Sequence, residues 1–163
     1  MFKKILIPWD GSALAAKILP EVEKMAKCFQ AKVVLLTVGS LSTVAIASEL
    51  TFKAEEEISA QLKSTAEKAL IAMTEKMKKR GVKASYAYTE GSAANEIISY
   101  AEGNRCDLIA MATHGKGEVA WILGSVAEKV VSHATVPVLL MRVMEIKPPV
   151  SKEEYAMRIM GPD

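Results

Sequence analysis

Short hydrophobic runs alternate with longer amphipathic stretches along most of the chain. Five of these runs predict β-strands, at Lys4–Pro8, Lys32–Val38, Val82–Thr89, Asp107–Ala112 and Pro137–Val143. Near-continuous apolar strands that are separated by helices are typical of a parallel sheet covered on both faces. The third run differs because polar and apolar residues alternate within it, which favours a place nearer the edge of the sheet.

The stretches between the strands carry apolar residues at helical spacing. The first predicted helix follows Ser12, a suitable N-cap residue. Its apolar stripe consists of Leu14, Ile18, Val22, Met25 and Phe29. Pro20 lies inside this stripe and is expected to kink or divide the helix, because proline lacks the N–H that a helix interior needs. Two further core helices are predicted at 92–102 and 125–133.

The longest helical stretch runs from Glu49 to Arg80 and is followed by Gly81, a common residue at helix ends. We predict that its inner face is formed by Ile58, Leu62, Ala66, Ala69, Met73 and Met77. The segment 39–50 before it is rich in small and hydroxyl residues and is long for a connection between a strand and a helix. Such long loops are often functional.

Five parallel strands joined by right-handed crossovers predict an α/β domain with a doubly wound sheet and helices on both faces. The domain is expected to span residues 1–143, and residues 144–163 are expected to form a tail that could contain one short helix. In the simplest order the chain moves one way from strand one to strand three and then returns, so strands one and four become neighbours. Ligands of such sheets bind beyond the carboxyl ends of the strands at this reversal point.

Composition and charge exclude several other classes of protein. The 163 residues are half hydrophobic and a quarter charged, which suits one globular domain. The net charge is +2, charges of both signs are interleaved, and aromatic residues make up only 6%, so no nucleic-acid surface is indicated. No apolar run suits a bilayer span or a secretory signal. Cys28 and Cys106 form no C-x-x-C motif, which fits a reduced, cytoplasmic protein with packing cysteines.

The predicted site is built from the two segments that follow strands one and four. These segments are Pro8–Ser12 and Ala112–Gly117, and both contain glycine and polar residues. The second segment leads on to Gly124 and Ser125, where a helix starts. Glycine allows a backbone to approach a phosphate, and a helix N-terminus offers N–H donors, so this loop is a candidate phosphate cradle. A structural alternative also exists, because Ser125 and Glu128 match a capping box.

Several individual residues have both a structural and a functional interpretation. Asp10 could contact a ligand or only shape a turn before a glycine, and Trp9 could pack against a base or belong to the core. His114 has no evident orienting partner for acid–base catalysis, so we interpret it as a loop-shaping or phosphate-contacting residue. His133 fits a favourable charge near a helix C-terminus. With two histidines and no C-x-x-C motif, no metal site made by the protein is expected.

The segment Ile7–Ser12 resembles the P-x-D-[GF]-S start of the universal stress protein family. Residues 111–117, 123–128 and 136–140 are similar to the C-terminal signature of that family, and residues 90–98 to its loop and helix before strand four. The resemblance covers roughly residues 1–143. It implies a five-stranded parallel sheet in the order 3-2-1-4-5 and a homodimer, commonly paired through the last strand.

One branch of that family binds ATP through the motif G-x2-G-x9-G-[ST], and the other branch lacks these glycines. This chain reads Ala112-x2-Gly115-x8-Gly124-Ser125, so alanine replaces the first glycine and the loop is one residue shorter. The resemblance implies ATP or AMP as the ligand, accompanied by Mg²⁺. The contact residues that it implies are Pro8, Trp9, Asp10, Val38, Met111, Ala112, His114, Gly115, Gly124, Ser125 and Val126.

Within this set, the resemblance implies that Asp10 hydrogen-bonds the adenine-ribose side of the ligand and that the backbone of Val38 meets the adenine edge. Met111 and Ala112 would line the approach to the ribose and phosphates. The phosphate contacts would be made by His114, Gly115, Gly124, Ser125 and Val126, mostly through backbone N–H groups and the Ser125 hydroxyl.

Three functions remain open from the sequence. The first is a regulatory stress-response protein that binds ATP or AMP, acts as a dimer and is read by an unknown protein partner. The second is a dimeric interaction protein of the same fold that binds no nucleotide, and the altered glycine motif favours it. The third is an enzyme, at most a slow ATPase, which we place last because no nucleophile–base pair is visible.

Overall fold

The computed structural model describes residues 1–39, 52–113 and 123–143, and of residues 52–56 only the backbone. The elements are β1 Lys4–Pro8, α1 Ala13–Ala16, α2 Leu19–Phe29, β2 Lys32–Gly39, α4 Phe52–Lys79, β3 Lys83–Glu90, α5 Ala93–Gly103, β4 Leu108–Ala112, α6 Ser125–His133 and β5 Val138–Met141. Each predicted strand is confirmed, with its ends within two residues of those expected. The proposed tail, 144–163, lies outside the described residues.

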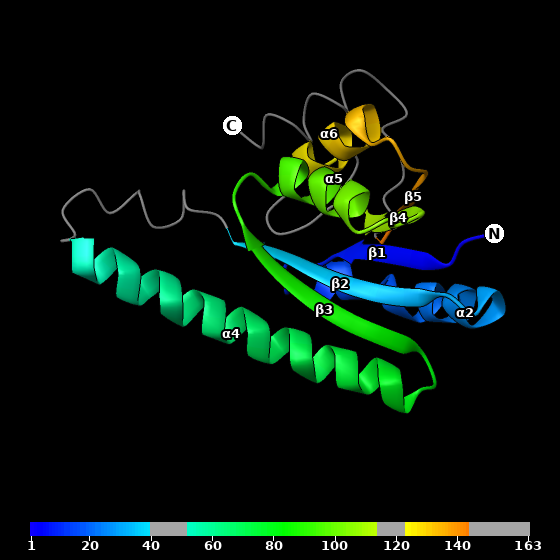
Figure 1. The fold of residues 1–163 in the computed structure, drawn as a ribbon, viewed down its shortest axis with the longest axis horizontal. Coiled ribbons are helices and arrows are strands. Elements are labelled where there is room, and N and C mark those ends of the chain that lie inside the picture. The colour runs from blue at the N-terminus through cyan, green and yellow to red at the C-terminus, as the bar shows by residue number, and fades with distance from the viewer. Residues whose placement is uncertain (40–51, 114–122, 144–163) are drawn as a thin grey trace, which may run out of the picture.

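The strands form one parallel sheet in the order β3-β2-β1-β4-β5. This is the predicted order, and it makes β1 and β4 neighbours at the point where the order reverses (Figure 1). The polar and apolar alternation of β3 is explained by its place at one edge of the sheet, while β5 forms the other edge. The sheet therefore has its switch point where the strand pattern placed it.

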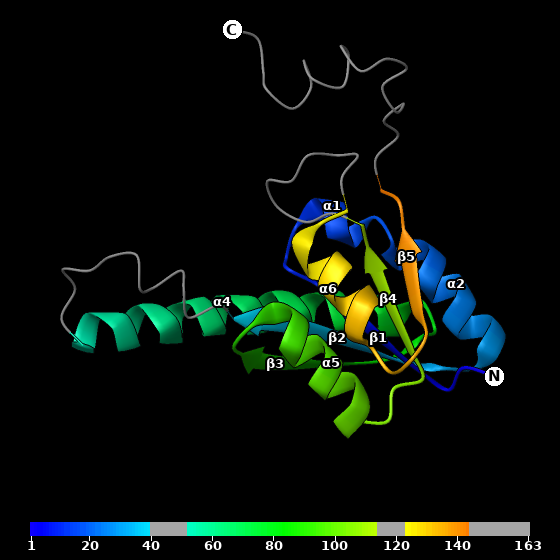
Figure 2. The same ribbon diagram turned by 90° about the horizontal axis from the view of Figure 1, so that it is seen from above.

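Helices cover both faces of the sheet, as predicted (Figure 2). On one face, Ile5 and Ile7 of β1 belong to a core that also contains residues of α2 and α4. On the other face, Leu6 belongs to a second core with residues of α5 and α6. Successive side chains of a strand point to opposite faces, which is why a strand buried on both sides has to be apolar at every position.

The first predicted helix is divided, as Pro20 indicated. α1 ends at Ala16 and α2 begins at Leu19, with the proline in the first turn of α2, where its missing N–H leaves no helix bond unmade. Ser12 is the N-cap of α1, and its Oγ accepts a hydrogen bond from the Ala15 N–H at 3.0 Å. The cap fixes the direction in which the chain leaves β1, next to the predicted site.

The long helix α4 ends as the sequence predicts. Gly81 has a φ of +83°, and the Val82 N–H donates to the carbonyl oxygen of Met77 at 3.1 Å, which closes the helix end. Arg80 then joins α4 to α2 through an ion pair of 3.1 Å with the buried Glu23. No helix among the described residues is both long enough and apolar enough to span a membrane.

The predicted inner face of α4 is correct only in its second half. Met77 is buried against the sheet, but Ile58 and Leu62 are exposed, and the fully buried Leu70 was not part of the predicted stripe. Figure 1 gives the reason, because the first turns of α4 extend past the ends of β2 and β3. An apolar stripe predicts the face that a helix can bury, and the length of the sheet decides how much of it is buried.

The two cysteines are unpaired thiols, as expected. Cys106 is buried in the core under α5 and α6, and this burial raises the pKa of its thiol above the usual value. The nearby Lys4 partly opposes the shift, and Asp107 adds to it. Cys28 is exposed on α2, so the interpretation as a packing residue holds for Cys106 and is wrong for Cys28.

Candidate functional site

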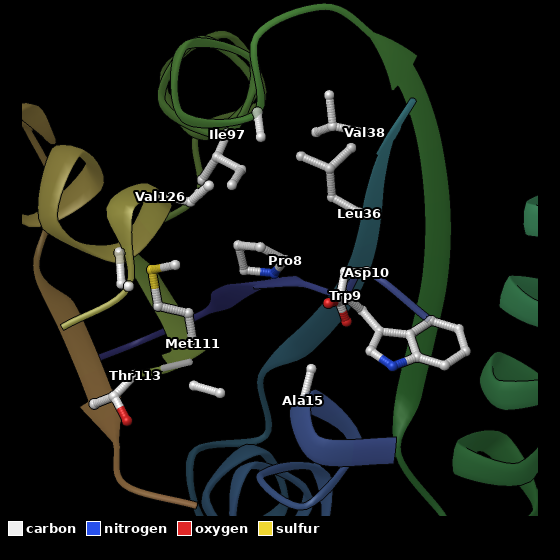
Figure 3. A pocket seen from close by; sticks show the side chains of 14 residues that line it. Pro8, Trp9, Asp10, Ala15, Leu36, Val38, Ile97, Met111, Thr113 and Val126 are labelled. Carbon is white, nitrogen blue, oxygen red and sulfur yellow. The ribbon is translucent and has the colours of Figure 1, made fainter. Parts of the chain in front are cut away.

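A cavity of about 280 Å³ opens at the carboxyl ends of the strands, beside the switch point between β1 and β4. Its walls come from β1, β2 and β4, from the turn after β1 and the short helix α1, and from the N-terminal parts of α5 and α6. The lining residues are Pro8, Trp9, Asp10, Ala15, Leu36, Val38, Ala93, Ile97, Met111, Ala112, Thr113, Gly124, Val126 and Ala127. Leu36 and Val38 lie on one side, Met111 and Thr113 lie across from them, and Ile97 projects into the cavity near Val126 (Figure 3).

The structure brings most of the predicted site residues together in this one cavity. The predicted residues that line it are Pro8, Trp9, Asp10, Val38, Met111, Ala112, Gly124 and Val126. Ser125 lies between two lining residues and is exposed. His114 and Gly115 lie outside the described residues. That any of these residues contacts a ligand stays a prediction.

Six lining residues are missing from the predicted contact residues, although Thr113 lies in the predicted segment Ala112–Gly117: Ala15, Leu36, Ala93, Ile97, Thr113 and Ala127. Ala93 and Ile97 belong to α5, which follows β3, so the rule that looks only after strands one and four could not find them. A signal did exist, because both residues lie in the segment 90–98 that resembles the family pattern. Leu36, Thr113 and Ala127 lie within two residues of predicted ones along the chain, and Ala15 belongs to α1, which follows the predicted segment Pro8–Ser12.

Asp10 shapes a turn and lines the cavity at the same time. Its Oδ1 accepts a hydrogen bond from the Ser12 N–H at 2.9 Å, and Gly11 between them has a φ of +79°. The turn interpretation of Asp10 is therefore correct, and glycine suits the middle position because it adopts positive φ without strain. The carboxylate is exposed at the mouth of the cavity, where a ligand can reach it.

The indole of Trp9 belongs to the core. The residue is only 7% exposed and packs in the core shared with α2 and α4. Its Nε1–H donates to the carbonyl oxygen of Ser12 at 3.2 Å, and Figure 3 shows the ring directed away from the cavity. Of the two interpretations, packing in the core is the correct one for the ring.

The N-terminus of α6 forms part of the cavity wall. Gly124 is the N-cap, so the predicted capping box of Ser125 and Glu128 does not form, because Ser125 is already the first helical residue. The Gly124 N–H donates to the carbonyl oxygen of Thr113 at 2.9 Å, which ties the start of α6 to the end of β4. A glycine cap offers no side-chain acceptor to the first N–H groups, and the helix dipole favours an anion there.

The side of the cavity toward β2 presents a backbone edge. β2 continues to Gly39, paired with β3, whereas its pairing with β1 ends at Pro8 and Leu36. Val38 therefore lies beside a gap in the sheet, is half-buried and lines the cavity. A strand edge of this kind carries a donor and an acceptor side by side.

The described wall of the cavity is mostly apolar. Asp10 is the one charged residue among the lining residues of the described chain, and these include no nucleophile with a base beside it. Within the described ranges, no group of His, Cys, Asp or Glu is arranged to hold a metal ion. The cavity combines apolar walls, a carboxylate, a backbone edge and a helix N-terminus.

These features define the chain as a doubly wound α/β domain with a cavity at its topological switch point. Comparison with known proteins identifies the family, because the sequence model of the Universal stress protein family matches residues 1–142. The chain belongs to this family.

Curated relatives and a solved structure agree with this assignment. The chain is 38% identical to universal stress protein MJ0531 of Methanocaldococcus jannaschii over 144 residues, covering 87% of this chain and 83% of the relative. It is 34% identical to universal stress protein YxiE of Bacillus subtilis, covering 87% of this chain and all of the relative. The structure of MJ0577 superposes with a TM-score of 0.77 at 30% identity, covering 86% of this chain and 95% of that one.

Proposed function

We propose that this chain is a regulatory stress-response protein of the cytoplasm that binds an adenine nucleotide, ATP or AMP with Mg²⁺, in the switch-point cavity. The observation that carries the proposal is the composition of one cavity wall. This wall has an apolar side with a backbone edge. It also contains a helix N-terminus that lacks a side-chain cap. A nucleotide needs both, because its base is flat and largely apolar and its phosphates are anionic.

The base would lie on the apolar side of the cavity. Leu36 and Ile97 would contact its faces there, and Val38 offers the backbone edge. Adenine carries a donor next to an acceptor on one edge, which matches the N–H and C=O of a strand residue. Asp10 stands at the mouth, where a carboxylate can accept hydrogen bonds from ribose hydroxyls.

The phosphates would lie toward the start of α6. Gly124 and Val126 line the cavity there, at the positive end of the helix dipole. Mg²⁺ would be held mainly by the phosphates themselves, since this metal keeps several waters and binds readily to phosphate oxygens. Two other structures of this fold are complexes of universal stress proteins with cAMP and with dAMP. At 19% and 17% identity they bear on the fold alone.

Thermal unfolding with and without Mg-ATP tests the proposal. At a nucleotide concentration about 100 times the dissociation constant, binding should add roughly 2.7 kcal/mol to the free energy of unfolding. For a domain of this size the Tm should then rise by about 5–10 °C. We expect Asp10→Ala to lose most of this rise.

Asp10→Asn is the matched control for that experiment. Its amide oxygen can still accept the hydrogen bond of the turn from Ser12, so the fold of the turn is kept while the charge is removed. If wild-type protein that has been shown to be free of nucleotide keeps its Tm at millimolar Mg-ATP, the nucleotide proposal is refuted. The chain would then be the alternative, an interaction protein of this fold, which the buried methyl group of Ala112 in place of a glycine favours.

We also propose that the chain acts as a homodimer whose two copies pair through β5. This strand lies at the sheet edge, and its four apolar residues, Val138–Met141, are only half-buried in the single chain. The carbonyls of Pro137 and Met141 accept bonds from β4. Because the backbone groups of successive residues alternate in direction, those of Val138 and Leu140 point away from the sheet. An exposed apolar edge of this kind is a template for pairing with a second copy.

Val138→Pro should convert the dimer to a monomer. Proline removes the outward N–H of the first strand residue and leaves the bonds between β5 and β4 intact. Light scattering after size-exclusion chromatography measures the mass, and Val138→Ala, which keeps the N–H, should remain a dimer. A wild-type monomer at concentrations of tens of micromolar, or a Val138→Pro dimer of full stability, would exclude pairing through this strand.

A further inference from the structure

The hydrogen bonds between β1 and β2 follow a regular parallel ladder up to the cavity. The Lys32 N–H donates to the carbonyl oxygen of Lys3 at 2.8 Å, and the Trp9 N–H donates to that of Leu36 at 2.8 Å. In such a ladder every second residue of a strand points to the same neighbour. Continuing the series places the N–H of Val38 opposite the carbonyl oxygen of Trp9.

This next bond is replaced by a side chain. The Thr37 hydroxyl donates to the carbonyl oxygen of Trp9 at 2.7 Å, which is a short and well-formed hydrogen bond. Within the described ranges, the backbone bonds between β1 and β2 end with the Trp9–Leu36 bond. The Thr37 hydroxyl therefore occupies the Trp9 carbonyl, which a continued ladder would pair with the N–H of Val38.

β2 itself stays extended beyond this point because β3 holds it. The pairing with β3 runs on to Gly39 and Glu90, and the Gly91 N–H donates to the carbonyl oxygen of Gly39 at 2.9 Å. Tyr88 of β3 also packs closely on Gly39, where any side chain would collide with its hydroxyl. Val38 is thus fixed in position although its neighbour on the β1 side is missing.

We propose that Thr37 is a positioning residue that keeps the backbone N–H of Val38 out of the sheet ladder and open to a ligand in the cavity. Only the identity of the ligand rests on the proposed function; the separation of Val38 from the ladder does not. Thr37 touches no ligand itself and acts through the Trp9 carbonyl. Residue type matters here, because valine has the same shape as threonine but cannot donate.

A purely structural role for the hydroxyl makes the opposite prediction. If it only satisfies a carbonyl, Thr37→Val should lower stability and leave the Val38 N–H as it was. If it diverts the ladder, removing it frees the Trp9 carbonyl for Val38. The Thr37→Val protein then keeps its stability, and the cavity loses the Val38 N–H as a hydrogen-bond donor. The two roles differ in whether hydrogen exchange of the Val38 amide changes.

Amide hydrogen exchange by NMR on the ligand-free Thr37→Val protein is the deciding measurement. We expect exchange of the Val38 amide to slow by about fivefold or more, because a sheet hydrogen bond now protects it. Thr37→Ser keeps the hydroxyl and should exchange like the wild type. Ser85→Ala is the matched control, since it removes a side-chain bond of 3.5 Å to the carbonyl of Val33 far from the cavity.

Titration with Mg-ATP on the same variants forms the second arm. Thr37→Val should bind about five- to tenfold more weakly than the wild type, and Thr37→Ser and Ser85→Ala should bind like it. Unchanged Val38 exchange in Thr37→Val overturns the inference, whatever the titration gives. Slower exchange in a protein that binds no nucleotide supports the role of Thr37 and refutes only the proposed function. Slower exchange with full ATP affinity overturns the link between Val38 and the ligand.

Discussion

Val126→Asp is expected to weaken binding of an adenine nucleotide by more than about a hundredfold without lowering the Tm of the free protein. Val126 is half-buried, lines the cavity and is the second residue of α6. A carboxylate at that place interacts favourably with the helix dipole, which stabilises the fold by about 0.3–1 kcal/mol. The same carboxylate repels phosphate oxygens a few ångströms away, with a cost of about 3–4 kcal/mol at an effective dielectric constant of 20.

Opposite effects on stability and affinity make this variant informative. Calorimetric titration with Mg-ATP measures the affinity, and a melting curve without ligand measures the stability. Val126→Thr is the matched control, because it keeps the shape of the side chain and adds no charge, so its affinity should stay close to that of the wild type. Undiminished ATP affinity in Val126→Asp would mean that the phosphates do not lie at the start of α6.

The sheet and the place of its cavity were predictable because they depend on patterns that extend along the whole chain. Apolar runs such as Lys32–Val38 are typical of strands buried on both faces, and right-handed crossovers leave few ways to connect them. Once strands one and four are neighbours, the switch point follows, and Asp10 and Gly124 fall beside it. No single residue had to be interpreted correctly for this result.

Local details failed where several arrangements suit the same residues. Ser125 and Glu128 match a capping box, but the chain makes Gly124 the N-cap and begins the helix one residue earlier than the box requires. Trp9 alternates with Asp10 along an extended segment, so one of them faces the core and the other the cavity. Nothing in the sequence states which one. Such choices depend on the angle at which a helix or turn meets the sheet.

The role inferred for Thr37 could not be found from the sequence, because it depends on register. Only the pairing of Pro8 with Leu36 shows that the next ladder donor is Val38 and that its acceptor is already occupied. A shift of one residue would turn the hydroxyl to the other face of the sheet. The family resemblance pointed to Val38, and the register gives a physical reason why its backbone is open to the cavity.

Leu70→Ala should cost about 2–5 kcal/mol of unfolding free energy, whereas Leu62→Ala should change it by about 0.5 kcal/mol or less. Both leucines lie on α4 in a sequence that is amphipathic throughout, and the sequence pattern selected Leu62 for the core. In the structure Leu70 is fully buried against the sheet, and Leu62 is 49% exposed. Truncating Leu70 opens a cavity among close-packed residues, and truncating Leu62 removes contacts that are mostly with water.

Urea unfolding of both variants measures the difference, and the slope of the transition checks that the two unfold alike. A β-sheet buries only the part of a helix that lies over it, so the cost of truncation should drop at the turn of α4 where β2 and β3 end (Figure 1). Similar costs for the two leucines would contradict this. They would mean that the first turns of α4 are packed against something in solution, and that the single folded chain is not the complete stable unit.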